Sequence, residues 1–260
     1  MTTLNSASGS VARLGKSKYL AAKYFQYTCA ASGIVCLVLF LCGLASAGFL
    51  PPIRPSLTAE QTTKHYRDHK TGVKVAVIFL MLSGMFYLPF TAVISGQIRR
   101  IPNLHSSVHS LQLAAGAAGI FTFLIPPMIL AVITYRLDRN PEITQALSDL
   151  FFIIALIPWP TFLIQNFAFS YAVLVDHREK PIFPKYIALV NVVAPVLFVP
   201  AISMHFVKSG PLAWNGGVSF WMAAVAFGIQ VCIDSLSLMR CITIESQENV
   251  TENELSTREL

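Results

Sequence analysis

The hydrophobic residues of this chain fall in six separate blocks, and each block is long enough to form a helix that crosses a lipid bilayer. A hydrocarbon layer about 30 Å thick requires about 20 apolar residues in a helix that rises 1.5 Å per residue. A transmembrane barrel would alternate apolar and polar residues, whereas runs such as 75–82 and 150–157 are continuously apolar. The pattern therefore predicts an all-α polytopic transmembrane bundle. We expect its spans at about 25–49, 73–97, 108–135, 150–175, 186–207 and 217–239.

Prolines and polar connecting segments predict the internal organisation of this bundle. Prolines at 89, 126, 127, 158, 160, 195 and 200 predict kinks in four spans, because proline removes a backbone donor and frees carbonyl groups. The longest loop predicts a short outer helix near 56–70, with Ser56 as N-cap and Glu60 close behind. We expect a cytoplasmic tail at 1–24, the bundle at 25–240, and a disordered cytoplasmic tail at 241–260, since that last segment is polar and acidic.

The composition is typical of a membrane protein, and in such a protein a positive net charge does not indicate nucleic-acid binding. Hydrophobic residues make up 54% of the chain and charged residues 12%, which is more apolar material than a soluble domain of 260 residues can bury. The formal net charge is +6, but no basic face of domain size exists, so we expect no nucleic-acid partner. The cysteines lie in or beside the apolar blocks, which does not fit a disulfide framework. They are Cys29, Cys36, Cys42, Cys232 and Cys241.

The distribution of lysine and arginine predicts the orientation in the membrane. With six spans, 11 of the 19 lysines and arginines fall on the side of the two termini and eight on the opposite side. Because cytoplasmic loops are enriched in positive residues, both termini are expected in the cytoplasm. The first span leads to Ala45-Ser46-Ala47, which a signal peptidase could cut, but its near-span length favours an uncleaved anchor. The 11 residues are Arg13, Lys16, Lys18, Lys23, Arg99, Arg100, Arg178, Lys180, Lys185, Arg240 and Arg258.

A stripe of basic residues is expected on the outer helix. Lys64, Arg67, Lys70 and Lys74 share one helical face and lead into the second span. The stripe could pair with acidic residues of the third outer segment, bind lipid phosphates, or be a solvated face at the interface. Those acidic residues are Asp138, Glu142 and Asp149.

Side-chain amides inside the spans are the main candidates for a polar cavity or for interhelical contacts. Interhelical hydrogen bonds of this kind contribute about 0.6 kcal/mol each. The rival interpretation is a polar chamber that proline-kinked helices leave open. The amides are Gln112, Gln165, Asn166, Asn191 and Gln230.

Two acidic residues, Asp149 and Asp234, lie near the ends of their predicted spans. We expect both to reach water or headgroups, with Asp149 favoured as a helix-start residue over a catalytic acid. No Lys, Arg or Glu lies in the middle of any predicted span. The sequence therefore predicts that no buried ion pair or proton relay operates at the bilayer centre.

Histidine spacing offers a candidate metal site. His65 and His69 are four residues apart, so on a helix they could present two ligands on one face if further ligands converge. His105 and His109 repeat the spacing on the opposite side of the membrane, so the two pairs cannot share a centre. For each pair, loop or interfacial histidines are the favoured interpretation over a metal site. No nucleotide, dinucleotide or common hydrolase motif occurs, and we expect no cofactor.

Small residues in the third span predict a close helix contact. Ala115, Gly116 and Gly119 lie in an uninterrupted small-residue patch at 114–119, where a second backbone could approach closely. The contact could lie within the bundle or join a second copy of the chain or another membrane protein.

Three segments carry a resemblance to known proteins. They are Pro55-Ser56-Leu57 ahead of a helix with Tyr66, Gln-Ile-Arg-Arg-Ile at 97–101, and Ser-Gly-Pro-Leu-Ala-Trp-Asn-Gly at 209–216. With these segments, most of the chain resembles a group of uncharacterised bacterial six-span membrane proteins. The resemblance implies a bacterial inner (plasma) membrane protein and supplies no catalytic residue. Trp214 in the third segment is expected to anchor the membrane interface.

These observations favour a non-enzymatic bundle that binds lipid, a solute or a protein partner, as a small permease-like or accessory module. One alternative is a membrane enzyme that acts on a hydrophobic substrate through Asp149 or the outer histidines. The other is a structural subunit of a larger membrane complex.

Overall fold

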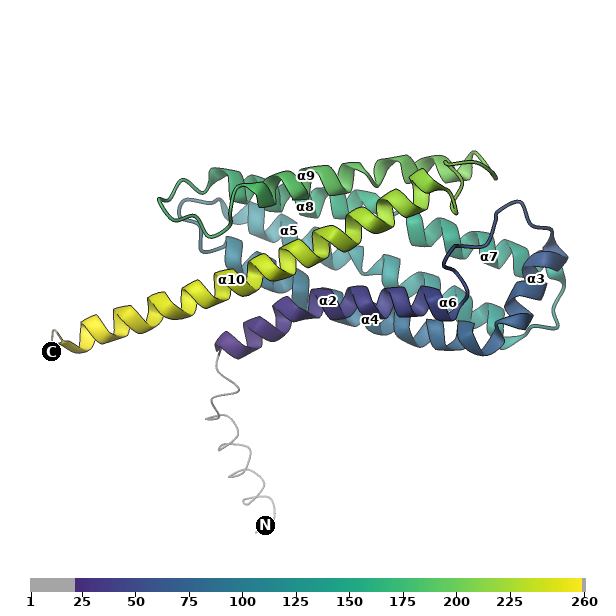
Figure 1. Cartoon of the computed structure of the whole chain (residues 1–260), viewed down its shortest axis with the longest axis horizontal. Helices are drawn as coiled ribbons and strands as arrows, with labels where there is room; N and C mark the ends of the chain where they lie inside the picture. Colours follow the sequence, from purple (N-terminus) through teal and green to yellow (C-terminus); the bar gives the residue numbers. More distant parts are fainter. Residues whose placement is uncertain (1–21, 259–260) are drawn as a thin grey trace, which may run out of the picture.

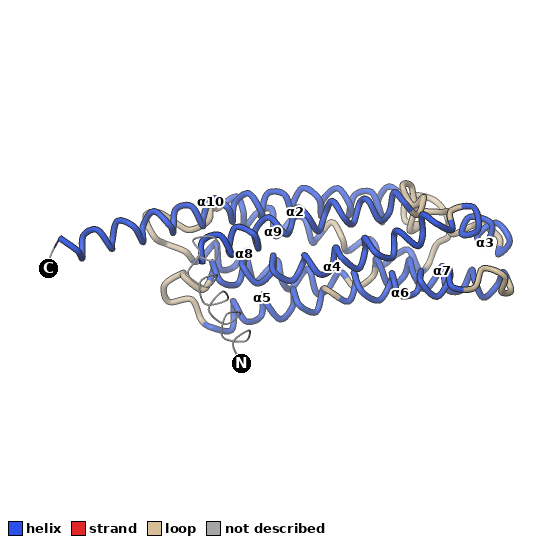
Figure 2. Tube along the Cα trace, turned by 90° about the horizontal axis from the view of Figure 1, so that it is seen from below, coloured by secondary structure: helices blue, strands red, loops and turns tan. Residues whose placement is uncertain are grey.

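The computed structural model describes residues 22–258, with side chains for 22–248, and its regular elements are all helical (Figures 1 and 2). Six helical segments are long and apolar enough to cross a membrane. They are Ala22–Ser46, Lys70–Ile98, Ser106–Tyr135, Pro141–Val175, Tyr186–His205 and Gly217–Glu248. The prediction of an all-α transmembrane bundle is confirmed.

Several spans consist of two successive helical elements. The α-helices are α2 (Ala22–Ser46), α3 (Ala59–Asp68), α4 (Lys70–Ile98), α5 (Ser106–Gly119), α6 (Phe121–Tyr135), α7 (Pro141–Leu156), α8 (Trp159–Val175), α9 (Tyr186–Val196) and α10 (Ala223–Arg258). A 3-10 helix, η2 (Val199–His205), continues α9, and a π-helix, η3 (Gly217–Met222), precedes α10.

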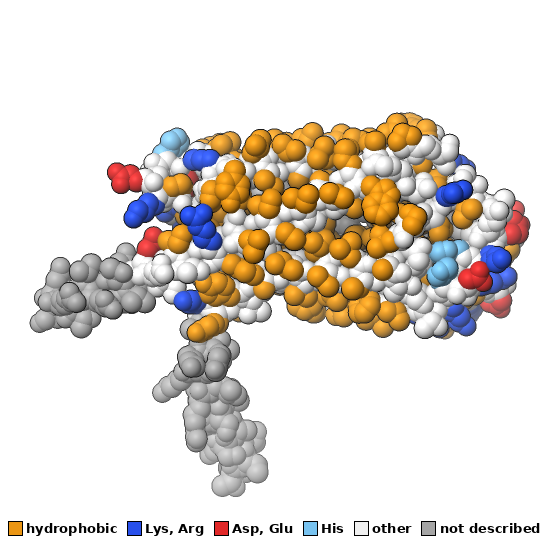
Figure 3. All heavy atoms as spheres, in the orientation of Figure 1, with side chains coloured by type: hydrophobic (Ala, Val, Ile, Leu, Met, Phe, Trp, Pro, Cys, Tyr) orange, Lys and Arg blue, Asp and Glu red, His pale blue; other side chains and the backbone are white. Residues whose placement is uncertain are grey.

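The helices run side by side, so the bundle has two distinct ends. At one end, the tail end, α2 begins and α10 leaves the bundle; at the other, the α3 end, α3 lies across the connecting loops (Figure 1). Figure 3 shows hydrophobic side chains over the middle of the visible face and charged side chains gathered at both ends. This distribution is the one that a hydrocarbon layer around the middle of the bundle requires.

Prolines mark two of the four breaks between successive elements of one span. The α7–α8 break lies at Pro158, and α9 gives way to a 3-10 helix just before Pro200. Pro89, by contrast, lies inside the continuous helix α4, and the α5–α6 break lies at Ile120, before the prolines of α6. A proline thus does not by itself decide where a packed helix breaks.

The fourth span begins nine residues before the position predicted from hydropathy. Asn140 caps α7, since its side chain accepts the backbone N–H of Glu142 at 2.9 Å, and Pro141 occupies the first turn. Asp149 therefore lies two turns inside the helix rather than at its start. The first turns of α7 are polar because they pack on α3 through the buried Thr144 and Ser148.

The outer helix is shorter than predicted and has a different cap. Thr58, not Ser56, is its N-cap, in a capping box with Gln61. The helix ends before His69, whose backbone dihedral angles separate α3 from α4. The basic stripe is therefore divided between two helices.

The last helix continues to Arg258, whereas the polar composition of 241–260 predicts disorder. No proline or glycine interrupts 241–258, and the first turns of this segment are held to α4 by ion pairs from Arg100 to Glu245 and Glu248. These contacts give the polar segment a tertiary anchor that composition does not reveal.

Aromatic packing closes the α3 end of the bundle. Trp214 is buried, stacks on Phe152 with ring centroids 5.0 Å apart, and donates its Nε1–H to the Ile53 carbonyl at 2.7 Å. It is therefore a packing residue that joins two loops, and not the exposed interface anchor expected from sequence.

Candidate functional site

A pocket of about 440 Å³ opens at the tail end, between the end of α4, the α8–α9 loop and α10. Four cationic side chains line it together with Glu248 and apolar residues. In the sequence these cations indicate only the orientation of the chain, and nothing there groups them into one site. The four cations are Arg100, Arg178, Lys180 and Arg240.

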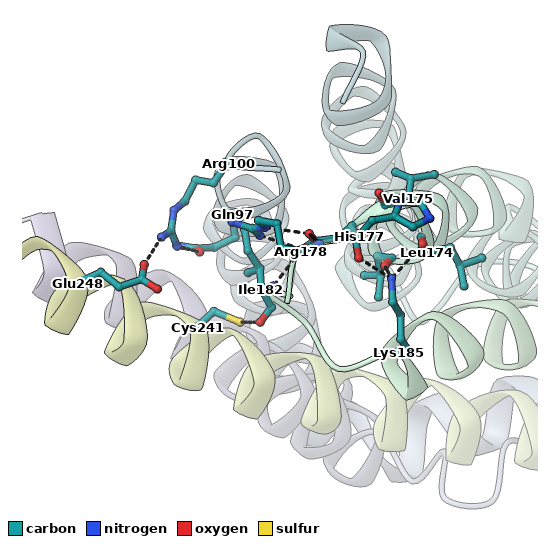
Figure 4. Close-up of polar contacts among 12 residues, drawn as sticks. Gln97, Arg100, Leu174, Val175, His177, Arg178, Ile182, Lys185, Cys241 and Glu248 are labelled. Atoms are coloured by element: carbon teal, nitrogen blue, oxygen red, sulfur yellow. Dashed lines mark hydrogen bonds and ion pairs between the residues drawn. The ribbon is translucent and has the colours of Figure 1, made fainter. Parts of the chain in front are cut away.

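Arg100 belongs to a hydrogen-bonded cluster that joins α2, α4 and α10, and Figure 4 shows its contacts with Gln97 and Glu248. The buried Gln97 donates to Gln26 of α2 at 2.7 Å and to Glu245 of α10 at 2.8 Å. Arg100 donates to Gln97 at 2.9 Å and forms ion pairs with Glu245 at 3.4 Å and Glu248 at 3.3 Å. This guanidinium is thus neutralised and held in place by the protein.

Arg178 is likewise paired within the protein. Its guanidinium donates two hydrogen bonds to Asp176, Nε to Oδ1 at 2.8 Å and Nη2 to Oδ2 at 2.7 Å. The Ile182 backbone N–H donates to the same carboxylate at 2.9 Å. Burial works to raise the pKa of Asp176, but these donors outweigh it and lower the pKa to about 2.

Lys185 shapes the loop that forms one wall of the pocket. Its ammonium donates to the carbonyls of Val173, Leu174 and Asp176 at 2.7 to 2.9 Å, and so caps the C-terminus of α8 (Figure 4). Cys241 of α10 donates its Sγ–H to the Ile182 carbonyl at 3.0 Å, which ties the loop to the last helix. The wall is therefore fixed on both sides.

Lys180 and Arg240 are the pocket cations that the protein leaves without a partner. Both are exposed, and neither forms a hydrogen bond or ion pair with any other residue that the structure describes. One projects from the α8–α9 loop and the other from α10, so they face the pocket from different elements. Two unpaired cations above apolar side chains can take an anion that is attached to an apolar body.

A second polar region lies inside the bundle, where α8, α9 and α10 meet. Gln230 donates to Asn166 at 2.7 Å and to Asn191 at 3.0 Å. Asn191 donates to Asp234 at 2.8 Å and to the Ile187 carbonyl at 3.1 Å. Three of the five amides predicted from sequence thus meet at one place, which we call the amide network.

The other two predicted amides meet at a neighbouring place between α4, α5 and α8. Tyr87 donates to Gln165 Oε1 at 2.6 Å, and the hydroxyl of Thr91 accepts from Gln165 at 3.0 Å and from Gln112 at 3.1 Å. Gly116 lets α5 come this close, because a Cβ there would lie 2.0 Å from the Thr91 hydroxyl. Sequence reasoning missed Tyr87 and Thr91, although they are four residues apart on one face of α4.

The small-residue patch is used inside the chain. Ala115, Gly116 and Gly119 are all buried within the described structure. Gly116 faces Thr91 of α4, and Gly119 faces Phe162 of α8. Of the two alternatives left open by the sequence, this is the contact within the bundle.

Asp234 differs from its expected surroundings. It was expected to reach water or headgroups, but it is 2% exposed and points into the amide network. The span also continues to Glu248, so Asp234 lies farther from its end than the predicted end near 239 implied. The direction of its side chain follows from packing against α9, which the sequence does not show. Asp149 remains partly exposed, in the middle of α7.

The outer histidines do not form a metal centre with other described residues. The rings of His65 and His69 stack with centroids 4.3 Å apart, but His65 Nε2 contacts the Ala47 carbonyl at 3.0 Å. Burial lowers the pKa of His65, although the hydrogen bond to Ala47 works against that change. In the described range, 22–258, no group of three or more His, Cys, Asp or Glu could hold a metal.

The basic stripe makes no ion pair with the acidic residues opposite. Arg67 donates instead to the Leu137 carbonyl at 3.0 Å, and so ties α3 to the α6–α7 loop. Lys64 and Lys70 are exposed and have no ion-pair partner in the described part of the chain.

Apolar cavities lie at mid-bundle, near the helix breaks. Their volumes are about 110 and 30 Å³, and they share lining residues that include Phe40, Phe123 and Phe220. Cavities of this size hold a molecule no larger than benzene, whereas pockets for larger ligands measure about 300 to 1,000 Å³. Two further pockets, of about 470 and 410 Å³, also have charged lining residues, Arg136 and Arg139 in the first and Asp176 and Arg178 in the second. The tail-end pocket differs from both because four cations line it.

The fold and these sites define the class: the chain is a multi-pass helical membrane protein with a basic pocket at one end of its bundle. Comparison with protein-family models, with curated proteins and with solved structures gives no match.

Proposed function

We propose that this protein is a lipid-binding accessory or permease-like bundle, and that its tail-end pocket holds the phosphate headgroup of an anionic lipid. The observation that carries the proposal is the pair of unpaired cations, Lys180 and Arg240, in a pocket of about 440 Å³ whose other cations are neutralised by the protein. A phosphate would balance the charge of these two cations, which have no partner in the described part of the chain.

The depth of the pocket along the bundle supports a lipid as the source of the phosphate. Arg240 of α10 lines the pocket, and Tyr186 at the start of α9 is 56% exposed in the same lining. Exposed tyrosine and snorkelling arginine are typical of the headgroup level of a membrane. Ile182 and Ile244 in the same lining offer an apolar surface to the glycerol and upper acyl region.

The charge distribution and the sequence resemblance support a location in a bacterial inner membrane. We place the protein in the inner (plasma) membrane of a bacterium with the tail end in the cytoplasm, where anionic lipid attracts juxtamembrane Lys and Arg by about 1 kcal/mol per residue. The resemblance to bacterial six-span proteins favours the same placement.

Native mass spectrometry of the purified full chain tests the proposal. The protein is titrated with phosphatidylglycerol and with phosphatidylcholine of identical acyl chains, and bound lipids are counted. We expect tighter binding of phosphatidylglycerol, and about a 30-fold loss of that binding in the double variant Lys180→Gln with Arg240→Gln, since two cations contribute about 2 kcal/mol.

A matched control removes the same charge at the other end of the bundle. The control variant, Lys64→Gln with Lys70→Gln, likewise removes two exposed cations that lack ion-pair partners in the described structure. This control should bind phosphatidylglycerol like the wild type. Equal affinity for the two lipids, or equal losses in the two double variants, would contradict the proposal. Competition by inorganic phosphate alone would show that the lipid body adds nothing.

A further inference from the structure

Asp234 is a carboxyl group inside the part of α10 that lies within the bundle. It is 2% exposed and precedes Arg240 by six residues, so it lies about 9 Å deeper along the helix axis at 1.5 Å per residue. Because Arg240 marks the headgroup level, Asp234 lies at the level of the hydrocarbon. The lipid-binding pocket does not use it.

The neighbours of Asp234 offer it no compensating cation. None of the ion pairs in the described part of the chain involves it. Of the elements that pack against α10, α2 faces this region with Cys36 and α4 with Tyr87, both neutral groups, while η3 has no titratable residue. The titratable residue of α9, Tyr186, is exposed at the start of that helix.

The hydrogen-bond inventory of the amide network has more acceptors than donors. Both N–H groups of Gln230 are used by Asn166 and Asn191, and both of Asn191 are used by Asp234 and a backbone carbonyl. Gln230 Oε1 is buried and has no donor in the described structure. A carboxylate would add only acceptors, whereas a protonated carboxyl group also brings a donor to this network.

We propose that Asp234 is a proton-binding site, which holds a proton at neutral pH and donates it within the amide network. An unpaired carboxylate at this depth would cost several kcal/mol or more, while the neutral acid keeps the bond from Asn191 and adds a new one. Loss of the proton would leave a buried negative charge that has an amide N–H of Asn191 beside it but no cation in the described structure. The contact between α8, α9 and α10 is therefore conditional on that proton.

Infrared spectroscopy of the full chain in lipid, at neutral pH, tests the proposal directly. A protonated carboxyl group gives a carbonyl stretch that shifts in D2O and that an ionised carboxylate lacks. We expect this band in the wild type and its loss in Asp234→Asn, which preserves the shape of the side chain. Asp149→Asn, a matched change in a partly exposed carboxyl group of α7, should leave the band in place.

A second measurement uses the wild-type chain and therefore does not depend on whether a variant folds. The chain has five aspartates, and labelling their side-chain carboxyl carbon with 13C should shift the band of the wild type. If the band neither shifts with labelled aspartate nor disappears in Asp234→Asn, the proposal is overturned. A carboxylate signal from Asp234 at neutral pH also overturns the proposal, whether sodium ions are present in the buffer or absent from it. Neither result would affect the lipid titration, which reports on a different pocket.

Discussion

At the scale of single residues, Asp176 and Asp234 show how surroundings decide what a carboxyl group does. Asp176 lies outside the spans, where a guanidinium and a backbone N–H stabilise its charge. Asp234 lies inside the bundle beside amides, with no cation to pair with in the described structure. The first carboxyl group is held ionised, and the second is the one for which we propose a bound proton.

Replacement of Asp176 by asparagine should destabilise the protein by about 2 kcal/mol at neutral pH, because Arg178 loses its charged partner and the Ile182 N–H a strong acceptor. The pKa of Asp176 falls from the ordinary 3.8 to about 2 in the fold. Its stabilisation is therefore fully present above about pH 4 and is lost as the pH falls through about 2. Thermal unfolding of the solubilised protein should show a difference between wild type and Asp176→Asn that narrows over this range.

The exposed neighbour Glu179 provides the control for this prediction. It carries the same charge in the same loop, and Glu179→Gln should leave the apparent Tm nearly unchanged, since surface charges contribute little. A pH-independent effect of Asp176→Asn would mean that shape rather than charge holds the loop.

Residue identity alone located the amides but not their partners. Gln165 and Asn166 are adjacent on α8, yet the first bonds to α4 and the second to α10. Polar residues in an apolar span are visible in the sequence. Which neighbour each one meets depends on how the helices pack, and adjacent residues on a helix face different neighbours.

At the scale of elements, the closest approach joins α2 to α4 at the α3 end. Gly72 lies in the first turn of α4, where an added Cβ would be 1.9 Å from the Ser46 carbonyl oxygen. Backbone cannot yield as a flexible side chain can. Gly72→Ala should therefore separate the two helices and destabilise the bundle by about 1 to 3 kcal/mol or more.

Gly96 is the matched control on the same helix, because nothing lies within 4 Å of an added Cβ there. Gly96→Ala should be neutral or stabilise the helix by up to about 1 kcal/mol, through the lower flexibility of alanine. Apparent Tm values of both variants in detergent measure the contrast. Similar Tm changes in the two variants would show that the α2–α4 approach is looser than described.

Hydropathy predicted the spans well and their ends less well, for a physical reason. The apolar blocks record which residues lie at the level of lipid, and a helix can continue beyond that level. The first turns of α7 are polar because they pack on α3, and the last turns of α10 are polar because they extend past the bundle. From composition, the first turns of α7 are therefore predicted as loop and the last turns of α10 as tail.

At the scale of the whole molecule, the basic pocket could not be predicted because it belongs to no single segment. Its cations come from α4, from the α8–α9 loop and from α10, each of which ends at the tail end of the bundle. Sequence reasoning counted these residues correctly on one side of the membrane. Their convergence, and the neutralisation of Arg100 and Arg178 by acidic neighbours, required the tertiary structure.

The orientation predicted for the molecule rests on a small excess of positive charge on the side of the two termini. The predicted count is 11 lysines and arginines on the side of the termini against eight on the other. Replacing Arg13, Lys16 and Lys18 by glutamine would leave eight on each side, so this variant should insert in mixed orientation. Green fluorescent protein fused to the C-terminus should fluoresce in the wild type, since it folds in the cytoplasm, and an alkaline phosphatase fusion should be inactive. The control replaces Lys64, Lys70 and Lys74 by glutamine, which lowers the number of positive residues on the opposite side and should keep the wild-type pattern. Phosphatase activity in the wild-type fusion would mean that the C-terminus lies outside the cytoplasm, contrary to the predicted orientation.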